Sequence, residues 1–421
     1  MIYLKLLLHL LIVSSIKQVK EKEYIRRSIY FEKIRPLIHQ QLIKVFVGQR
    51  RVGKSNLLYQ AIDEIKRLTP GKKILFVDKE DYQYDHIRDY HDLMAFVKRE
   101  IKDDAEAALF IDEIQEIDQF QKALRSLLSE GRFDIYCTGS NAKLLSGELA
   151  TVLTGRYIEI PVHPLSYLEY LTFHRLENTK EALQKYLVQG GMPYLIHLPG
   201  EEEVVMQYLK TVFNTILYKD IVSRFNIRNT NFLEALVKFI GDNLGSLLSA
   251  KKISDFLKSQ RINISVQVVI DYLSHLEAAQ VVRKVQRAEV GGKKIFEIGE
   301  KHYFEDVGIR NAIVGHRVDH IHKILENVVY NHMVISGYEV FVGKHDQREI
   351  DFMCKKGAEI KYIQVAYILA EQATIDREFG NLLRIKDNHP KFVISMDDVL
   401  PQTNRDGIIH THLQTFLSEY Q

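Results

Sequence analysis

The chain has 421 residues, which exceeds one typical domain and suffices for two to four. Hydrophobic residues make up 46% and charged residues 27%, as in soluble globular proteins, and the formal net charge of +2 excludes a global bias toward nucleic acid or acidic membranes, although not a local basic patch. Cys137 and Cys354 lack the spacing of a disulfide framework or a zinc site, which fits a reducing cytoplasm.

Residues 1–16 form an apolar run that Lys5 and His9 interrupt. The run is shorter than a membrane span, no basic leader precedes it, and no small-residue cleavage site follows. The alternatives are a signal or anchor and a packed or frayed N-terminal extension. We favour an extension over residues 1–22 and expect no stable membrane insertion.

Strand and helix patterns alternate through the first 165 residues. Short apolar runs of the kind found in buried parallel strands lie at residues 43–47, 73–78, 108–113, 133–138 and 157–161. Helical spacing lies between them, at residues 55–68, 89–101 and 117–129. This order predicts an α/β fold with a parallel sheet covered on both faces.

The pattern then changes to helices. Residues 180–188 and 203–225 have helical periodicity, and a Gly-Gly-Met-Pro break separates them. Between 231 and 300 three helices precede two strands, at 281–287 and 293–298, which is the order of a winged helix. Mixed elements follow: a helix at 320–335, strands near 338–342, 349–354 and 361–365, a helix at 374–386 and a strand at 391–395.

Residues 48–55 read GQRRVGKS and match the phosphate-binding loop G-x-x-x-x-G-K-[ST] between a strand and a helix. Gly48 and Gly53 let the backbone turn its N–H groups toward phosphate oxygens. Lys54 supplies a positive charge to the β- and γ-phosphates, and the Ser55 hydroxyl is a ligand for Mg²⁺. The predicted ATP-binding residues are Gly48, Gln49, Arg50, Arg51, Val52, Gly53, Lys54, Ser55 and Asn56.

The run ALFIDE places two acids at the end of a buried strand. Asp112 is predicted to hold Mg²⁺ together with Ser55, and Glu113 to orient or deprotonate the attacking water. The alternative is that both acids merely end a strand. Ser140 and Asn141 follow the next strand and are either γ-phosphate or water contacts or the cap of a helix.

Arg156 precedes the fifth predicted strand. It is a candidate arginine finger that acts on the ATP of a neighbouring subunit, or else part of a surface ion pair. A finger predicts a homo-oligomer. Arg224 and Arg228 are weaker candidates for a sensing arginine.

Several motifs together resemble a prokaryotic family of AAA-type ATPases related to archaeal ATPases and STAND NTPases, with a C-terminal domain of unknown function. The motifs are GQRRVGKS, LFIDEIQ, CTGSNAKLL, LTGRYIEIPVHPLSYLEY and QGGMP, in that order. The resemblance spans about residues 23 to 400. It implies an ATP-binding core, a winged-helix segment and a module similar to restriction endonucleases, whereas the physiological substrate of most members is not established.

The strands REIDF and YIQVAY resemble the acid-rich core of that nuclease fold. Glu326 and Asp351 stand where metal-binding acids are expected, but Gln364 replaces the second acid and Ala366 replaces the lysine. We therefore expect a catalytically inactive or binding-only module.

The predicted winged helix has a second helix whose outward residues include Asp271 and Glu277, which suit phosphate poorly, and basic residues mostly in its wing. A DNA partner and a protein partner remain open alternatives. The predicted domains are an extension at 1–22, a P-loop core at 23–165, a helical lid at 166–230, a winged helix at 231–315 and a nuclease-like module at 316–421.

Three functions follow from these features. The leading hypothesis is a cytoplasmic ATPase whose Mg·ATP state changes how the C-terminal half holds a partner. The alternatives are an ATP-gated DNA-binding protein with a degenerate nuclease module and a nucleotide switch that does not hydrolyse ATP.

Overall fold

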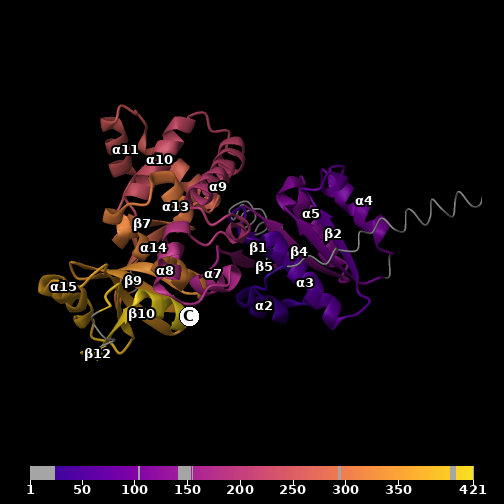
Figure 1. The fold of residues 1–421 in the computed structure, drawn as a ribbon. Coiled ribbons are helices and arrows are strands. Elements are labelled where there is room, and N and C mark those ends of the chain that lie inside the picture. Colours follow the sequence, from indigo (N-terminus) through magenta and orange to yellow (C-terminus); the bar gives the residue numbers. More distant parts are fainter. Residues whose placement is uncertain are drawn as a thin grey trace, which may run out of the picture. The chain divides into compact units, whose positions relative to one another are not determined.

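The computed structural model describes residues 24–102, 105–140, 153, 155–292, 295–398 and 404–420 (Figure 1). The chain divides into two compact units. The first contains the described residues within 24–46, 53–138 and 151–160, and the second contains residues 47–52, 139–140 and the described residues from 161 onward.

The first unit is built on a five-stranded sheet in the order β2-β3-β4-β1-β5. β2 pairs with β3 and β3 with β4 in parallel, with Asp78 opposite Asp112. β1, β3 and β4 are buried along their whole length, because their continuous apolar sequences are covered on both faces. The strands are β1 (Ile43–Gly48), β2 (Lys73–Asp78), β3 (Ala107–Asp112), β4 (Phe133–Gly139) and β5 (Tyr157–Val162).

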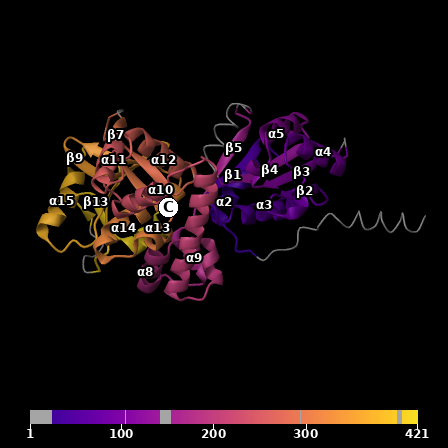
Figure 2. The ribbon, with the colours of Figure 1, turned by 90° about the horizontal axis from the view of Figure 1, so that it is seen from above.

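Helices cover both faces of this sheet. α2 (Ser28–Ile34) and α3 (Lys54–Leu68) lie on one face, and α4 (Tyr90–Glu100) and α5 (Phe120–Ser129) lie on the other (Figures 1 and 2). In such a sheet the carboxyl ends of parallel strands meet at one edge, where ligands bind. The predicted P-loop α/β fold is confirmed, as are its five strands and three helices.

A buried ion pair joins β1 to β4. The Lys44 ammonium lies 2.6 Å from a carboxylate oxygen of Asp134, and both side chains are almost fully buried. The same carboxylate accepts hydrogen bonds from the His39 backbone and the Tyr136 hydroxyl, at 3.0 and 3.1 Å. These bonds satisfy the oxygens of a charge that would otherwise be costly to bury.

The second unit begins with a helical region. Ser166 and Glu169 form a capping box at the start of α7. The predicted helix 203–225 is present as α9, but its last part is the π-helix η5, a rare form that is frequent at functional sites. The helices of this region are α7 (Tyr167–His174), α8 (Lys180–Gln189), α9 (Glu202–Thr215), η5 (Ile216–Ser223) and α10 (Thr230–Asp242).

The predicted helix, helix, helix, strand, strand order follows, as α10, α11, α12, β6 and β7. β6 pairs antiparallel with β7 and parallel with β8, so that the hairpin extends one eight-stranded sheet in the order β12-β13-β11-β10-β9-β8-β6-β7. The predicted boundary at residue 315 stays a prediction. The elements are α11 (Ala250–Ser259), α12 (Val266–Ala278), β6 (Val282–Glu289), β7 (Ile295–Phe304), α13 (Val307–Val314), β8 (Glu339–His345), β9 (Arg348–Lys356), β10 (Glu359–Val365), β11 (Lys391–Ser395), β12 (Asn404–Arg405) and β13 (Ile408–His412).

Both faces of the large sheet are packed. α14 (Ile321–Ile335) and α16 (Leu413–Glu419) share one core cluster with Ile363, whereas α15 (Gln372–Leu383) shares another with the adjacent Tyr362. Successive side chains of β10 thus point to opposite faces, as the period of a strand requires.

Within the described part of the chain, no helix combines the length and the apolar character that crossing a bilayer needs. The predicted N-terminal extension, residues 1–22, lies outside the described residues.

Candidate functional site

The phosphate loop connects β1 to α3 through two glycines that the backbone requires. Gly53 has a φ of 93°, a left-handed conformation that strains other residues. A Cβ atom on Gly48 would lie 2.3 Å from the carbonyl oxygen of Val162. The loop therefore depends on glycine at both positions where the motif specifies it.

The side chains of the loop point in different directions. Gln49 and Val52 are buried, whereas Arg51, with a φ of 72°, and Asn56, on α3, are exposed. The residues between the two glycines can therefore contact phosphate through their backbone N–H groups, which is how such loops bind.

Arg50 contacts the helical region. Its guanidinium donates two hydrogen bonds to the carboxylate of Asp220 in η5, with Nε–Oδ2 and Nη2–Oδ1 distances of 2.9 and 2.8 Å. Arg50 is 8% exposed and Asp220 is 2% exposed. The predicted cofactor-binding side chain of Arg50 is thus part of a bidentate, buried ion pair.

Asp112 ends β3 and is only 4% exposed. The Thr138 hydroxyl donates a hydrogen bond to its carboxylate, which also bonds the Ser55 side chain. Burial raises the pKa of Asp112 to about 6, which the two hydroxyl bonds oppose and the nearby Glu113 and Asp78 increase. The two predicted Mg²⁺ ligands, Ser55 and Asp112, are therefore in direct contact.

Glu113 adopts a left-handed backbone conformation, with a φ of 51°. Its N–H donates to the Thr138 hydroxyl at 2.8 Å, which fixes the turn at the end of β3. Its carboxylate accepts a hydrogen bond from the Gln115 amide, and one oxygen lies 3.8 Å from the Lys54 ammonium. The candidate catalytic acid thus lies beside the lysine of the phosphate loop.

The other predicted catalytic residues are less closely connected. Ser140 directly follows β4 and is buried. Asn141 lies outside the described residues. Arg156 precedes β5 and is exposed. Exposure is expected both of an arginine finger that acts on another subunit and of an ordinary surface residue.

Three polar residues of the P-loop site were missed by sequence reasoning. Thr138 contacts both acids, Gln115 contacts Glu113, and Asp78 ends the neighbouring strand opposite Asp112. The signal for Asp78 was present in KILFVD, which also ends in an acid, and that for Thr138 in a polar residue at the end of the fourth strand. Asp220 had no such signal.

The residues present fit Mg·ATP. A buried carboxylate in contact with the Ser55 hydroxyl offers Mg²⁺ two oxygen ligands, and the glycine-dependent loop offers backbone N–H groups to phosphate. When bound, Mg²⁺ would neutralise charge on the phosphate oxygens. Fold and site together define a P-loop nucleotide-binding domain.

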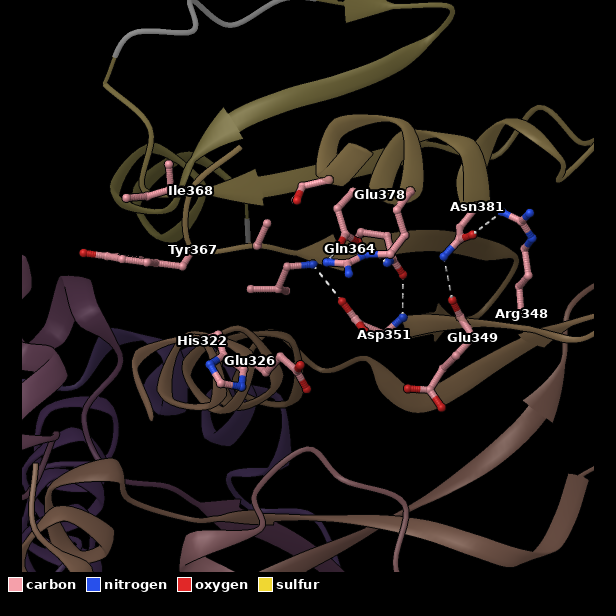
Figure 3. Close-up of a pocket in the computed structure, with 14 residues that line it drawn as sticks. His322, Glu326, Arg348, Glu349, Asp351, Gln364, Tyr367, Ile368, Glu378 and Asn381 are labelled. Carbon is pink, nitrogen blue, oxygen red and sulfur yellow. Dashed lines mark hydrogen bonds and ion pairs between the residues drawn. The ribbon is translucent and has the colours of Figure 1, made fainter. Parts of the chain in front are cut away.

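A cavity of about 720 Å³ lies beside the eight-stranded sheet and brings the predicted nuclease-like residues together (Figure 3). Glu326 of α14, Asp351 of β9, and Gln364 and Ala366, in and just after β10, all line it. The Gln364 amide oxygen accepts a hydrogen bond from the Asp351 N–H at 2.7 Å, and its nitrogen donates to Glu378 at 2.5 Å.

A lysine that sequence reasoning missed contacts these acids. The Lys301 ammonium of β7 lies 2.9 Å from Glu349, 3.4 Å from Glu326 and 3.8 Å from Asp351, and Lys301 is 2% exposed. Burial opposes its charge, but the three carboxylates outweigh burial and raise the pKa of Lys301 above its ordinary value. Over the described residues, no group of three or more His, Cys, Asp or Glu side chains is arranged to hold a metal ion.

Comparisons with known proteins agree with the fold. The sequence profile of a family described as an AAA domain matches residues 40–171, and that of a domain of unknown function (DUF8612) matches residues 180–319. An uncharacterized protein of Haemophilus influenzae is 35% identical over 393 residues, which cover 92% of this chain and 97% of that protein. An uncharacterized protein of Methanocaldococcus jannaschii is 30% identical over 386 residues, covering 88% and 84%. The chain belongs to the family of these two proteins, and it carries an AAA domain of the P-loop class.

Among solved structures, AMPPCP-bound DnaA from Aquifex aeolicus aligns with 60% of this chain and 89% of its own, at 15% identity and a TM-score of 0.30. A score this low carries no argument about function.

Proposed function

We propose that this protein binds Mg·ATP at the phosphate loop and hydrolyses it, and that the nucleotide state changes how the C-terminal half holds a partner. The observation that carries the proposal is the contact between Asp112, whose pKa is raised by burial, and Ser55 of the loop, with Glu113 and Lys54 alongside.

Each residue has a distinct role in this proposal. Lys54 and the loop N–H groups bind the β- and γ-phosphates, and Ser55 and Asp112 hold the metal. Glu113 orients the attacking water and accepts its proton, while Gln115 fixes the carboxylate. The side chains of Ser140 and Asn141 are candidates for contact with the γ-phosphate or the water.

Arg156 is proposed to act in trans, as an arginine finger on the ATP of a second copy of the chain. Its exposed side chain can reach a second copy of the chain. The proposal predicts that specific activity rises with protein concentration, because hydrolysis then requires assembly, and that Arg156→Ala removes this rise.

The test is ATP hydrolysis by the purified protein over a range of concentrations. We expect Lys54→Ala to lose binding and turnover, and Glu113→Gln to retain ATP binding but lose about 100-fold or more in turnover. Glu116→Gln is the matched control, because Glu116 is exposed in the same turn. If the wild type binds ATP without turning it over, the protein is a nucleotide switch and the role of Glu113 is wrong.

The partner is proposed to be a protein. The exposed residues of α12 are Val266, Gln267, Ile270 and Asp271, which carry no positive charge and suit a phosphate backbone poorly. Two basic side chains of the wing are already paired, Arg283 with Glu305 and Lys284 with Glu300. Duplex binding that is salt-dependent and changes with ATP would favour a DNA partner instead.

A further inference from the structure

The ion pair between Arg50 and Asp220 connects the phosphate loop to a segment far away in sequence. Arg50 is the third residue of the loop motif, and Asp220 lies in η5. The two hydrogen bonds are parallel and match the planar guanidinium to the carboxylate, a geometry that fixes orientation as well as distance. The loop and η5 therefore cannot move independently without breaking both bonds.

Because Arg50 and Asp220 are buried, separating them has a high cost in free energy. With Arg50 8% exposed and Asp220 2% exposed, either partner left alone would be a charge with little access to water. Breaking such a pair costs several kcal/mol, although its formation from two hydrated charges gains little. The pair is thus weak evidence for stability and stronger evidence for a required arrangement.

The segment that carries Asp220 has features of a movable element. η5 continues α9 as eight residues of π-helix, and π-helical turns are rare and occur often where function depends on local geometry. Arg224, directly after η5, has a buried guanidinium nitrogen without a hydrogen-bond partner. This donor does not hold the end of η5 to any neighbouring group by a hydrogen bond.

We propose that Asp220 is a positioning residue for the phosphate loop, and that through Arg50 it links nucleotide occupancy to the conformation of η5. The inference rests on the proposed nucleotide site. Asp220 neutralises the charge of the Arg50 side chain and holds it in place, so that the backbone N–H groups of the loop point toward the phosphates. A nucleotide that orders the loop then stabilises the loop-bound arrangement of η5, and linkage requires η5 to affect nucleotide affinity by the same factor.

The experiment is amide hydrogen exchange of residues 216–223, with and without AMPPCP and Mg²⁺, on the full chain. We expect the nucleotide to slow exchange in this segment about tenfold or more in the wild type. Local unfolding of the segment must then break the Arg50–Asp220 ion pair while the bound nucleotide holds the loop in place. In Asp220→Asn we expect AMPPCP to bind about tenfold more weakly, as linkage requires, and at saturating AMPPCP we expect the slowing at 216–223 to disappear.

Two further variants separate positioning from stability. Asp134→Asn breaks the buried pair with Lys44, which does not involve the phosphate loop, so that it lowers overall stability but keeps the nucleotide-dependent slowing. Arg50→Lys keeps the charge and loses the paired geometry, and we expect it to weaken the slowing as well. It serves in place of Asp220→Asn if that variant does not fold.

The outcomes distinguish this inference from the proposed function. If AMPPCP binds the wild type and residues 216–223 exchange at an unchanged rate, the link is absent and the nucleotide site stands. If Asp220→Asn or Arg50→Lys shows the full slowing, the link exists but does not pass through this pair, and the inference is overturned. If AMPPCP does not bind the wild type, the proposed function itself fails.

Discussion

The carboxylates of the phosphate-loop site and those of the C-terminal cavity have different neighbours. At the phosphate loop, the hydroxyl groups of Ser55 and Thr138 contact Asp112. In the C-terminal cavity, the ammonium of Lys301 lies within 4 Å of Glu326, Glu349 and Asp351. The hydroxyl groups carry no positive charge, whereas Lys301 supplies one; even so, burial and the nearby Glu326 outweigh Lys301 and raise the pKa of Asp351 to about 8.

The difference indicates which site suits a cation. A metal ion at Asp112 would replace no positive charge and would relieve the cost of burying the carboxylate. A metal ion at Asp351 would have to compete with Lys301 inside the protein. The comparison therefore favours the first site for a metal ion, and the inactivity of the C-terminal module stays a prediction.

The largest expected effect is the loss of stability on replacing Lys301. Lys301→Met leaves three carboxylates without their shared cation, and we expect unfolding by urea to show a loss of about 3–5 kcal/mol. Lys361→Met is the matched control, because Lys361 pairs with the half-exposed Glu359 at 3.3 Å, and should cost about 1 kcal/mol. Equal losses would show that the cluster is not held by Lys301.

Asp112→Asn should separate catalysis from stability. We expect turnover of Mg·ATP to fall about 100-fold or more, because a charged metal ligand is lost. Folding should not suffer. The folded pKa of about 6 exceeds the ordinary value of 3.8, so the wild type loses stability as pH rises between these values, and the variant has no such loss. A variant that is destabilised at pH 7 would contradict this account.

Gly48→Ala tests the close approach at the start of the loop. The added Cβ would meet the Val162 carbonyl oxygen at 2.3 Å, so the loop must shift, at a cost of about 1–3 kcal/mol in nucleotide affinity or stability. In Gly200→Ala the added atom meets nothing within 4 Å. Isothermal titration with ATP and thermal unfolding of both variants measure the difference, and indistinguishable variants would exclude the steric explanation.

The smallest effect is a pH dependence. Protonated Asp112 cannot bind Mg²⁺, so the affinity for Mg·ATP should weaken as pH falls below about 6, by up to about tenfold per pH unit. The Asp112→Asn variant lacks the titrating carboxyl, so that its pH dependence measures the contribution of the nucleotide's own protonation. A wild-type profile identical to that of the variant would mean that Asp112 does not ligate the metal.

Most of the helices and strands could be predicted from the sequence. β1, the phosphate loop and α3 could be predicted because a continuous apolar run, two glycines and a helical period each act locally. The five strands, the acids at the end of β3 and the helix order before β6 follow from the same local signals. Sequence reasoning did not assign the short helices α2, α7, α13 and α16 or the strand β13.

The contacts at the two sites could not be predicted because they depend on distant partners. Lys301 and Asp351 are 50 positions apart, and Arg50 and Asp220 are 170 apart. The direction of Lys301 depends on the register of β7, and that of Asp220 on the change from α9 to a π-helix, which no residue in ILYKDIVS specifies. Ala366 predicted a C-terminal site without a lysine, because the sequence does not show that Lys301 of β7 lies beside Glu326 and Asp351.

The parallel pairing of β6 with β8 has a consequence for biosynthesis. β6 and β7 precede α13, α14 and β8 in the chain, so that during synthesis β6 leaves the ribosome before the strand that pairs with its second edge. Unpaired edges promote association between chains, and long-range parallel pairing is slow. Nascent chains that stop before Glu339 are therefore expected to associate more readily than the full chain.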